Sequence, residues 1–162
     1  MALFQSRPDL VRVKDENIVS TWHALVPDAA GQCDKFFTEV ENALKQIMPD
    51  LVGTDRKEIE ISSKSAPKES RTCLRVMRKN GLPETGYHAY FSTEDIGKHL
   101  IVSRVVENKG SPLWGIFNAE EVSAYLSLIG AAGNAAKDVL LAGKQEIKMA
   151  NANKEGGIID IV

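Results

Sequence analysis

Three strand-like segments, residues 71–79, 87–91 and 100–106, constrain this chain more than any other feature of its sequence. Within them apolar side chains tend to recur at every second position, which is the period of a β-strand. Glycine and proline residues lie between the segments and favour turns,. The sequence therefore predicts an antiparallel meander across residues 71–106.

The alternation assigns the side chains of the meander to two faces. The predicted core face holds Leu74, Val76, Tyr87, Ala89, Phe91, Leu100 and Val102. The opposite face holds Arg71, Arg75, Lys79, His88, Tyr90, Ile101 and Val105. Because this second face mixes charges with sizeable apolar groups, it is more typical of a contact surface than of a plain wet face.

Further elements are expected on the N-terminal side of the meander. Ile59 and Ile61 alternate with polar residues and predict one more strand, and the apolar residues at 10–13 fit an edge strand,. Ile18, Trp22 and Leu25 recur at helical spacing before Pro27, so they predict a short helix,.

Two longer helices complete the expected fold. An apolar stripe predicts an amphipathic helix over residues 29–48, with Asp28 as its N-cap,. A second apolar pattern follows the N-cap residue Asn118 and runs to about Gly143.

The predicted class is therefore α+β: a four-stranded antiparallel sheet, with two N-terminal helices and one long C-terminal helix packed on one face. Residues 1–150 are expected to form a single domain, and residues 151–162 a flexible tail with an apolar end.

The charge balance and the apolar runs of the sequence limit which partners and which cellular location are expected. The chain has 20 basic and 22 acidic residues, so it carries no general attraction to nucleic acid or to an anionic membrane,. No apolar run is long enough to span a bilayer, and the N-terminal residues do not resemble a secretory signal,. We expect a cytoplasmic protein with two buried free thiols, Cys33 and Cys73.

No motif for chemistry emerges from the spacing of reactive residues. The three histidines, His23, His88 and His99, do not combine with cysteines or carboxylates at metal-ligand spacing,. Nucleophile and phosphate-loop motifs are also missing from the sequence,. We therefore predict no catalytic residue, no cofactor and no metal site, and the balance leans away from an enzyme.

The basic strand at residues 71–79 is the main electrostatic feature. Arg71, Arg75 and Lys79 share a face, with Tyr90 expected beside them. Such a face can hold phosphates and stack a base. We expect Glu58 and Glu60 on the same face of the neighbouring strand, however, where they would neutralise much of this charge.

Two further segments are candidates for partner binding. Trp114 and Phe117 would anchor an interface if exposed, and would be core residues if packed under the following helix,. After Gly156 and Gly157, the tail carries Ile158, Ile159, Ile161 and Val162. A segment of this kind can add a strand to a sheet edge of the same molecule, a second copy or another protein, and its terminal carboxylate suits a peptide-binding groove.

The leading hypothesis is a non-enzymatic module that binds a protein or a second copy of itself through a sheet face or edge and the apolar tail. Its proposed contact residues are Arg71, Arg75, Lys79, Tyr90, Ile101, Trp114, Phe117, Ile158, Ile159, Ile161 and Val162. The first alternative is binding of nucleic acid or a phosphorylated ligand through the basic strand. The second is a small-ligand carrier or enzyme with a site built from Tyr87, His88, Tyr90, His99 and Arg104.

Overall fold

The computed structural model describes residues 10–47, 49–50, 52–62, 69–78, 86–109 and 119–142, except for the side chains of Glu69 and of residues 119–122. In chain order, the elements in these ranges are β1 (Leu10–Lys14), the short 3-10 helix η2 (Asp15–Asn17), β2 (Ile18–Val26), α1 (Cys33–Ile47), β3 (Val52–Ser62), β4 (Glu69–Arg78), β5 (Tyr87–Ile96), β6 (His99–Asn108) and α3 (Ala119–Ala142).

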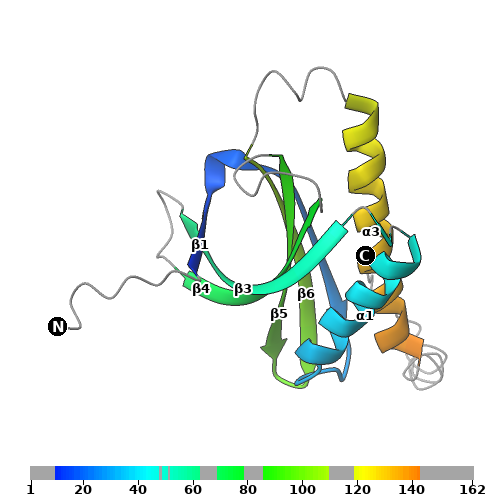
Figure 1. The fold of residues 1–162 in the computed structure, drawn as a ribbon. Coiled ribbons are helices and arrows are strands. Elements are labelled where there is room, and N and C mark those ends of the chain that lie inside the picture. The colour runs from blue at the N-terminus through cyan, green and yellow to red at the C-terminus, as the bar shows by residue number, and fades with distance from the viewer. Residues whose placement is uncertain are drawn as a thin grey trace, which may run out of the picture.

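The strands form one six-stranded sheet in the order β1-β3-β4-β5-β6-β2 (Figure 1). β1 pairs with β3 in parallel, and the other neighbours pair antiparallel. The α+β class is confirmed. The predicted four-stranded antiparallel sheet with three helices is wrong, because the sheet is mixed and has six strands, and the described ranges hold two α-helices.

A short connection makes the sheet curl. β1 and β2 lie at opposite edges of the sheet, yet the three residues of η2 are all that separates them in the chain. Three residues span at most about 10 Å, so the two edges must approach each other at this corner. Figure 1 shows the resulting curved sheet, and Val13 of β1 packs in one apolar cluster with Ile18 of β2.

The predicted helix around Trp22 is wrong, because residues 18–26 form the strand β2. A segment of nine residues is short enough to fit both the period of a helix and the period of a strand. Ile18, Trp22 and Leu25 fit one face of a helix. Trp22, Ala24 and Val26 fit one face of a strand. Four of the nine residues are β-branched, which favours the strand,. Pairing with β6 from Ile18 to Val26 decides the outcome.

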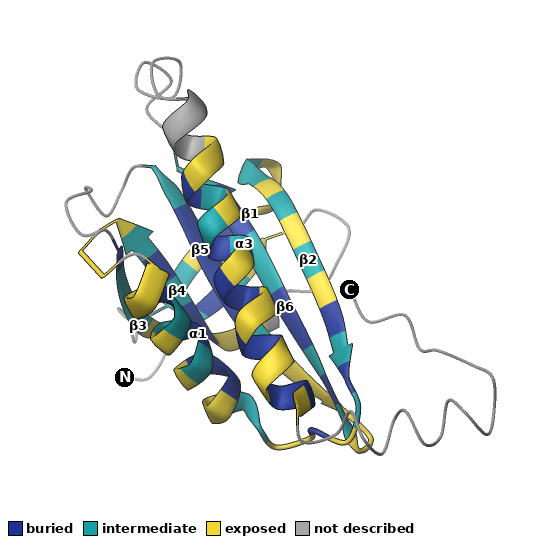
Figure 2. Cartoon of the chain, turned by 90° about the vertical axis from the view of Figure 1, so that its right-hand side faces the viewer, coloured by how far each residue is buried: buried dark blue, intermediate teal, exposed yellow. Residues whose placement is uncertain are grey.

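The two helices cover one face of the sheet and lie side by side (Figure 2). α1 begins at Cys33 rather than at Ala29, because Asp28 and Gly31 have positive φ angles of 57° and 82° and form a loop. This loop is tied to the β5–β6 hairpin, where Gly31 N donates to Asp95 Oδ1 at 2.9 Å. The predicted helix after Asn118 is confirmed as α3.

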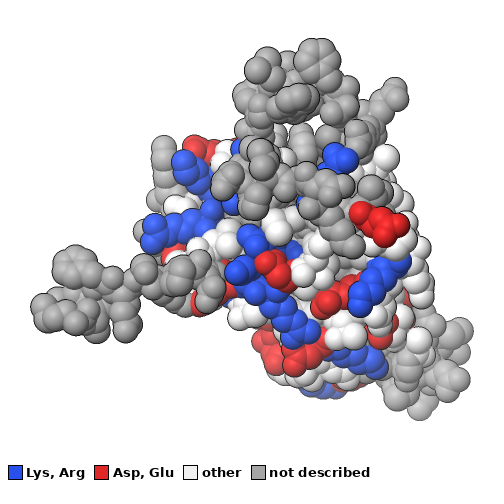
Figure 3. All heavy atoms as spheres, viewed as in Figure 1, with Lys and Arg blue, Asp and Glu red and all other residues white. Residues whose placement is uncertain are grey.

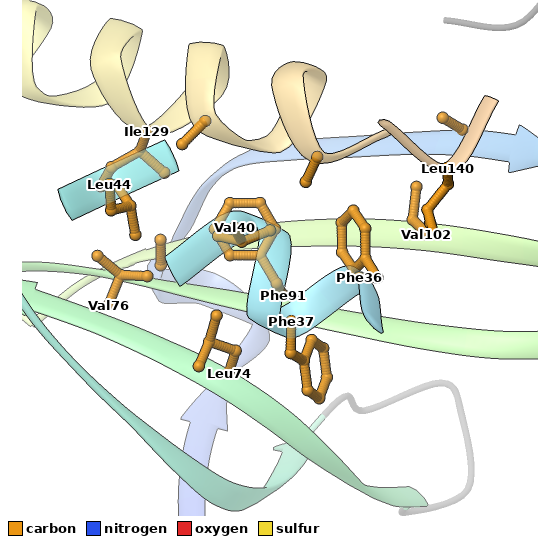
Figure 4. Packing of buried hydrophobic residues seen from close by; sticks show 14 of the residues in the cluster. Phe36, Phe37, Val40, Leu44, Leu74, Val76, Phe91, Val102, Ile129 and Leu140 are labelled. Carbon is orange, nitrogen blue, oxygen red and sulfur yellow. The ribbon is translucent and has the colours of Figure 1, made fainter. Parts of the chain in front are cut away.

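The main core lies between the helices and the sheet. Phe36 of α1 meets Phe91 of β5 edge-on, with ring centroids 6.1 Å apart, and Val102 and Leu140 pack nearby (Figure 4). The predicted core face of the meander is confirmed: six of its seven side chains are buried, and Tyr87 packs against them partly buried.

Two glycines of α3 let the helix approach the sheet. A Cβ at Gly133 would lie 2.8 Å from Cε1 of Phe91, whose ring is fully buried. A Cβ at Gly130 would lie 3.0 Å from Nη1 of Arg104, the far end of a flexible side chain. The two positions therefore differ in how easily the neighbour can move.

We predict opposite effects for alanine at these two glycines. Gly130→Ala should stabilise the protein by up to about 1 kcal/mol, because alanine is the better helix former. In Gly133→Ala the same gain should be outweighed by overpacking of about 1–3 kcal/mol. Urea unfolding of both variants checks this, and a Gly133→Ala protein as stable as Gly130→Ala would contradict the close packing at Phe91.

Candidate functional site

The basic strand β4 is largely neutralised by carboxylates of neighbouring strands. Arg75 Nε and Nη2 donate to Asp55 Oδ1 and Oδ2 at 2.9 and 2.7 Å. This bidentate bond raises the pKa of Arg75, whose side chain is 13% exposed,. Arg71 Nη2 lies 3.5 Å from Glu94 Oε2. Figure 3 shows basic and acidic side chains interspersed on the side seen in Figure 1.

The acidic partners differ from those expected. Glu58 and Glu60 pair in register with Thr72 and Ser70, one position away from Arg71. Since neighbours along a strand point to opposite faces, the two glutamates lie on the face away from Arg71, and the expectation is wrong. Glu58 instead accepts a hydrogen bond from Ser70 Oγ at 2.8 Å.

A buried polar cluster lies on the face opposite the helices. Tyr90 is 2% exposed, and its hydroxyl donates to Oε1 of Glu107, also 2% exposed, at 3.2 Å. Lys109 Nζ lies 3.8 Å from the same oxygen, and the backbone N–H of Lys14 also donates to the Glu107 carboxylate. His88 lies beside them, with its ring centroid 6.4 Å from that of Tyr90.

Burial sets the ionisation of this cluster. Desolvation raises the pKa of Glu107 above its ordinary value, although Lys109 and the bonds from Tyr90 and Lys14 act in the other direction,. Burial, together with the nearby Glu107, also raises the pKa of Tyr90. Desolvation raises the pKa of Cys73 to about 12, so this thiol is not a nucleophile at neutral pH,.

The residues of the predicted hairpin site do not converge. Tyr87 and Arg104 lie on the face toward the helices, where the Arg104 guanidinium is 5.9 Å from the Trp22 ring and burial lowers its pKa. His88 and Tyr90 lie on the opposite face. His99 stands at the far end of the hairpin, where its Nδ1 accepts the N–H of Asp28 at 3.2 Å.

The remaining predicted contact residues are placed as follows. Ile101 is half-buried in β6, opposite Leu25 of β2. Lys79, Trp114, Phe117, Ile158, Ile159, Ile161 and Val162 lie outside the described residues. The predicted partner-binding role of the whole set stays a prediction.

The edge strand β2 is a feature that the sequence reasoning missed. It pairs with β6 on one side, and no described strand pairs with its other side. Figure 2 shows it at the rim of the sheet, with exposed positions along its length. The β-branched residues and the alternation of Trp22, Ala24 and Val26 were the signals that could have identified it.

Across the described ranges, no three His, Cys, Asp or Glu side chains are grouped so as to hold a metal ion. Neither of the described helices is long and apolar enough to cross a membrane.

We predict that Glu107→Gln alters how stability depends on pH. Because the folded-state pKa is raised above the ordinary 4.5, the contribution of Glu107 is fully present below pH 4.5 and is lost as pH rises through the folded pKa,. The glutamine amide would keep an oxygen for Tyr90 and Lys14 without the buried charge.

The variant should therefore be more stable than the natural protein at pH 8, and the difference should shrink toward pH 4. Urea midpoints between these pH values test this. A natural protein that gains stability over the variant as pH rises would mean that the hydrogen bonds to the carboxylate outweigh its desolvation.

Comparison with known proteins identifies no family. No family model and no curated protein matches the sequence. Among solved structures, TTHA0849 from Thermus thermophilus is similar over 77% of this chain and 97% of its own, at 10% identity and a TM-score of 0.37. Ara h 8.0201 is similar over 76% and 98%, at 14% identity and a TM-score of 0.33.

The di-domain ARO/CYC protein BexL from the BE-7585A biosynthetic pathway is similar over 75% of this chain and 50% of its own, at 12% identity and a TM-score of 0.25. Likenesses at these TM-scores assign neither a family nor an activity to this chain.

Proposed function

We propose that this chain is a non-enzymatic, cytoplasmic protein-binding module that self-associates, and that β2 of one copy pairs antiparallel with β2 of a second copy. The two curled sheets would then continue into each other across a two-fold axis. Symmetric pairs of this kind are the commonest form of homo-oligomer.

The observation that carries this proposal is the unprotected edge of β2. Sheet edges in natural proteins are usually guarded by charged side chains, proline or very short strands. β2 has nine residues and contains no Lys, Arg, Asp, Glu or Pro; its pairing with β6 shifts register between Ile18 and Ser20 and is regular from Ser20 to Val26. The opposite edge strand, β1, has five residues and carries Arg12 and Lys14.

The sequence of β2 also fits a copy of itself. If two strands pair antiparallel about Trp22, Trp22 meets its own copy, Thr21 faces His23, and Val19 faces Leu25. None of these pairs sets like charges opposite each other, and aromatic and β-branched cross-strand pairs are favourable. Val19 is 52% exposed and would gain apolar contact.

The first alternative function has less support. The bidentate bond between Arg75 and Asp55 and the ion pair between Arg71 and Glu94 leave less positive charge for a phosphate. This difference favours the protein-binding proposal over the nucleic-acid proposal.

The test is the mass of the protein in solution after Val19→Lys. The natural chain of 17.7 kDa should approach twice that mass in light scattering as its concentration rises. A lysine at position 19 occurs twice in each dimer and removes two apolar contacts, so it should raise the dimer dissociation constant about tenfold or more.

The matched control is Val139→Lys, which places the same substitution on α3 at a residue of similar exposure, 43% against 52%. It should leave the dissociation constant unchanged. Two lysine variants that weaken the dimer equally, or a chain that stays monomeric at several hundred micromolar even after residues 158–162 are deleted, would overturn pairing through β2.

A further inference from the structure

We infer that residues 158–162 of the same chain add as an extra strand to the outer edge of β2 and so restrain its pairing with a second copy. The restraint rests on the proposed self-association, whereas the docking of the segment does not. β2 would then have two competing occupants, its own C-terminal segment and another β2.

The first support is that residues 143–157 are long enough to bring residues 158–162 to β2. α3 passes Trp22 at Gly133, where a Cβ would be 3.7 Å from the ring, and Leu140 packs beside Val102, which pairs in register with Ala24 (Figure 4). α3 therefore ends near the C-terminal end of β2. Residues 143–157 can extend to about 50 Å, and the nine residues of β2 span about 30 Å,.

The second support is that the residue types of 158–162 suit a strand beside β2. Residues 158–162 read Ile-Ile-Asp-Ile-Val, four β-branched apolar residues that suit a strand,. If Ile159 and Ile161 lie beside the half-buried Trp22, alternation places Asp160 on the other face of the sheet. The exposed His23, the one ionisable residue of β2, lies on that face, with its Nδ1 3.0 Å from Ser103 Oγ.

The third support is the high effective concentration of residues 158–162 near β2 of the same chain. A flexible chain of fifteen residues would have a root-mean-square length of about 21 Å, which is within the length of about 30 Å that β2 spans,. Tethering at such a length gives a millimolar local concentration of the segment. At micromolar protein, the attached segment therefore meets β2 far more often than a second molecule does.

Amide hydrogen exchange on the monomer tests the docking directly. At low micromolar protein, β2 amides that do not bond to β6, and amides of residues 158–162, should exchange about tenfold more slowly than in unpaired chain. Deleting residues 158–162, or combining Ile159→Asp with Ile161→Asp, should release the β2 amides. Val139→Asp serves as the control and should change nothing there. Equal exchange in the natural and deleted chains would overturn the docking.

Light scattering on the same variants separates the docking from the self-association. Deleting the segment should lower the apparent dimer dissociation constant about tenfold, because β2 no longer has to be uncovered. A dimer that weakens on deletion would mean that the segment docks on the second copy, which overturns docking within one chain. If β2 amides are released but no dimer forms at any concentration, the docking stands and the proposed self-association fails.

Discussion

The three-residue connection between β1 and β2 is the constraint on which the rest of the structure depends. It joins the two opposite edges of a six-stranded sheet, so the sheet cannot lie flat. The curl divides the strand side chains between an outer face, which α1 and α3 cover, and an inner face, where Val13, Ile59, Cys73 and Tyr90 pack together. A longer connection would leave β1 free to pair elsewhere, and the inner cluster would lose one of its walls.

The same corner explains why a carboxylate is buried on the inner face. Glu107 pairs in register with Ile18 at the start of β2, and its carboxylate accepts the backbone N–H of Lys14 at the end of β1. It therefore bridges the strands on either side of η2, while Tyr90 and Lys109 compensate part of its desolvation. These partners offset part of the desolvation of the Glu107 carboxylate, which is why it can be buried in a stable fold,. An apolar residue at this position would leave the Tyr90 hydroxyl and the Lys14 N–H without their acceptor.

The sequence predicted those parts of the fold that depend on local periodicity. The meander from Arg71 to Val106, the stripe of α1 and the helix α3 each repeat one period over many residues, and burial follows that period. β2 is short enough to satisfy two periods, and the pairing that decides between them involves β6, about eighty residues away. The parallel pairing of β1 with β3 is likewise set by long-range contacts. The register of β3 on β4 depends on the same kind of contact. In that register Asp55, rather than Glu58 or Glu60, lies opposite Arg75 of the basic strand.

The site could be predicted less well than the fold, because its decisive property is an absence of charge along one edge. Arg71, Arg75 and Tyr90 attract attention in a sequence, yet Asp55, Glu94 and Glu107 satisfy them within the sheet. β2 has no charged Lys, Arg, Asp or Glu that would mark it as a site in the sequence. Its importance is apparent only from the sheet topology, which places it at an edge. The edge strand β1 carries Arg12 and Lys14, whereas the edge strand β2 contains no Lys, Arg, Asp or Glu. An edge strand of nine residues without such charges is of the kind that tends to recruit another strand, and the proposed self-association depends on this property of β2,.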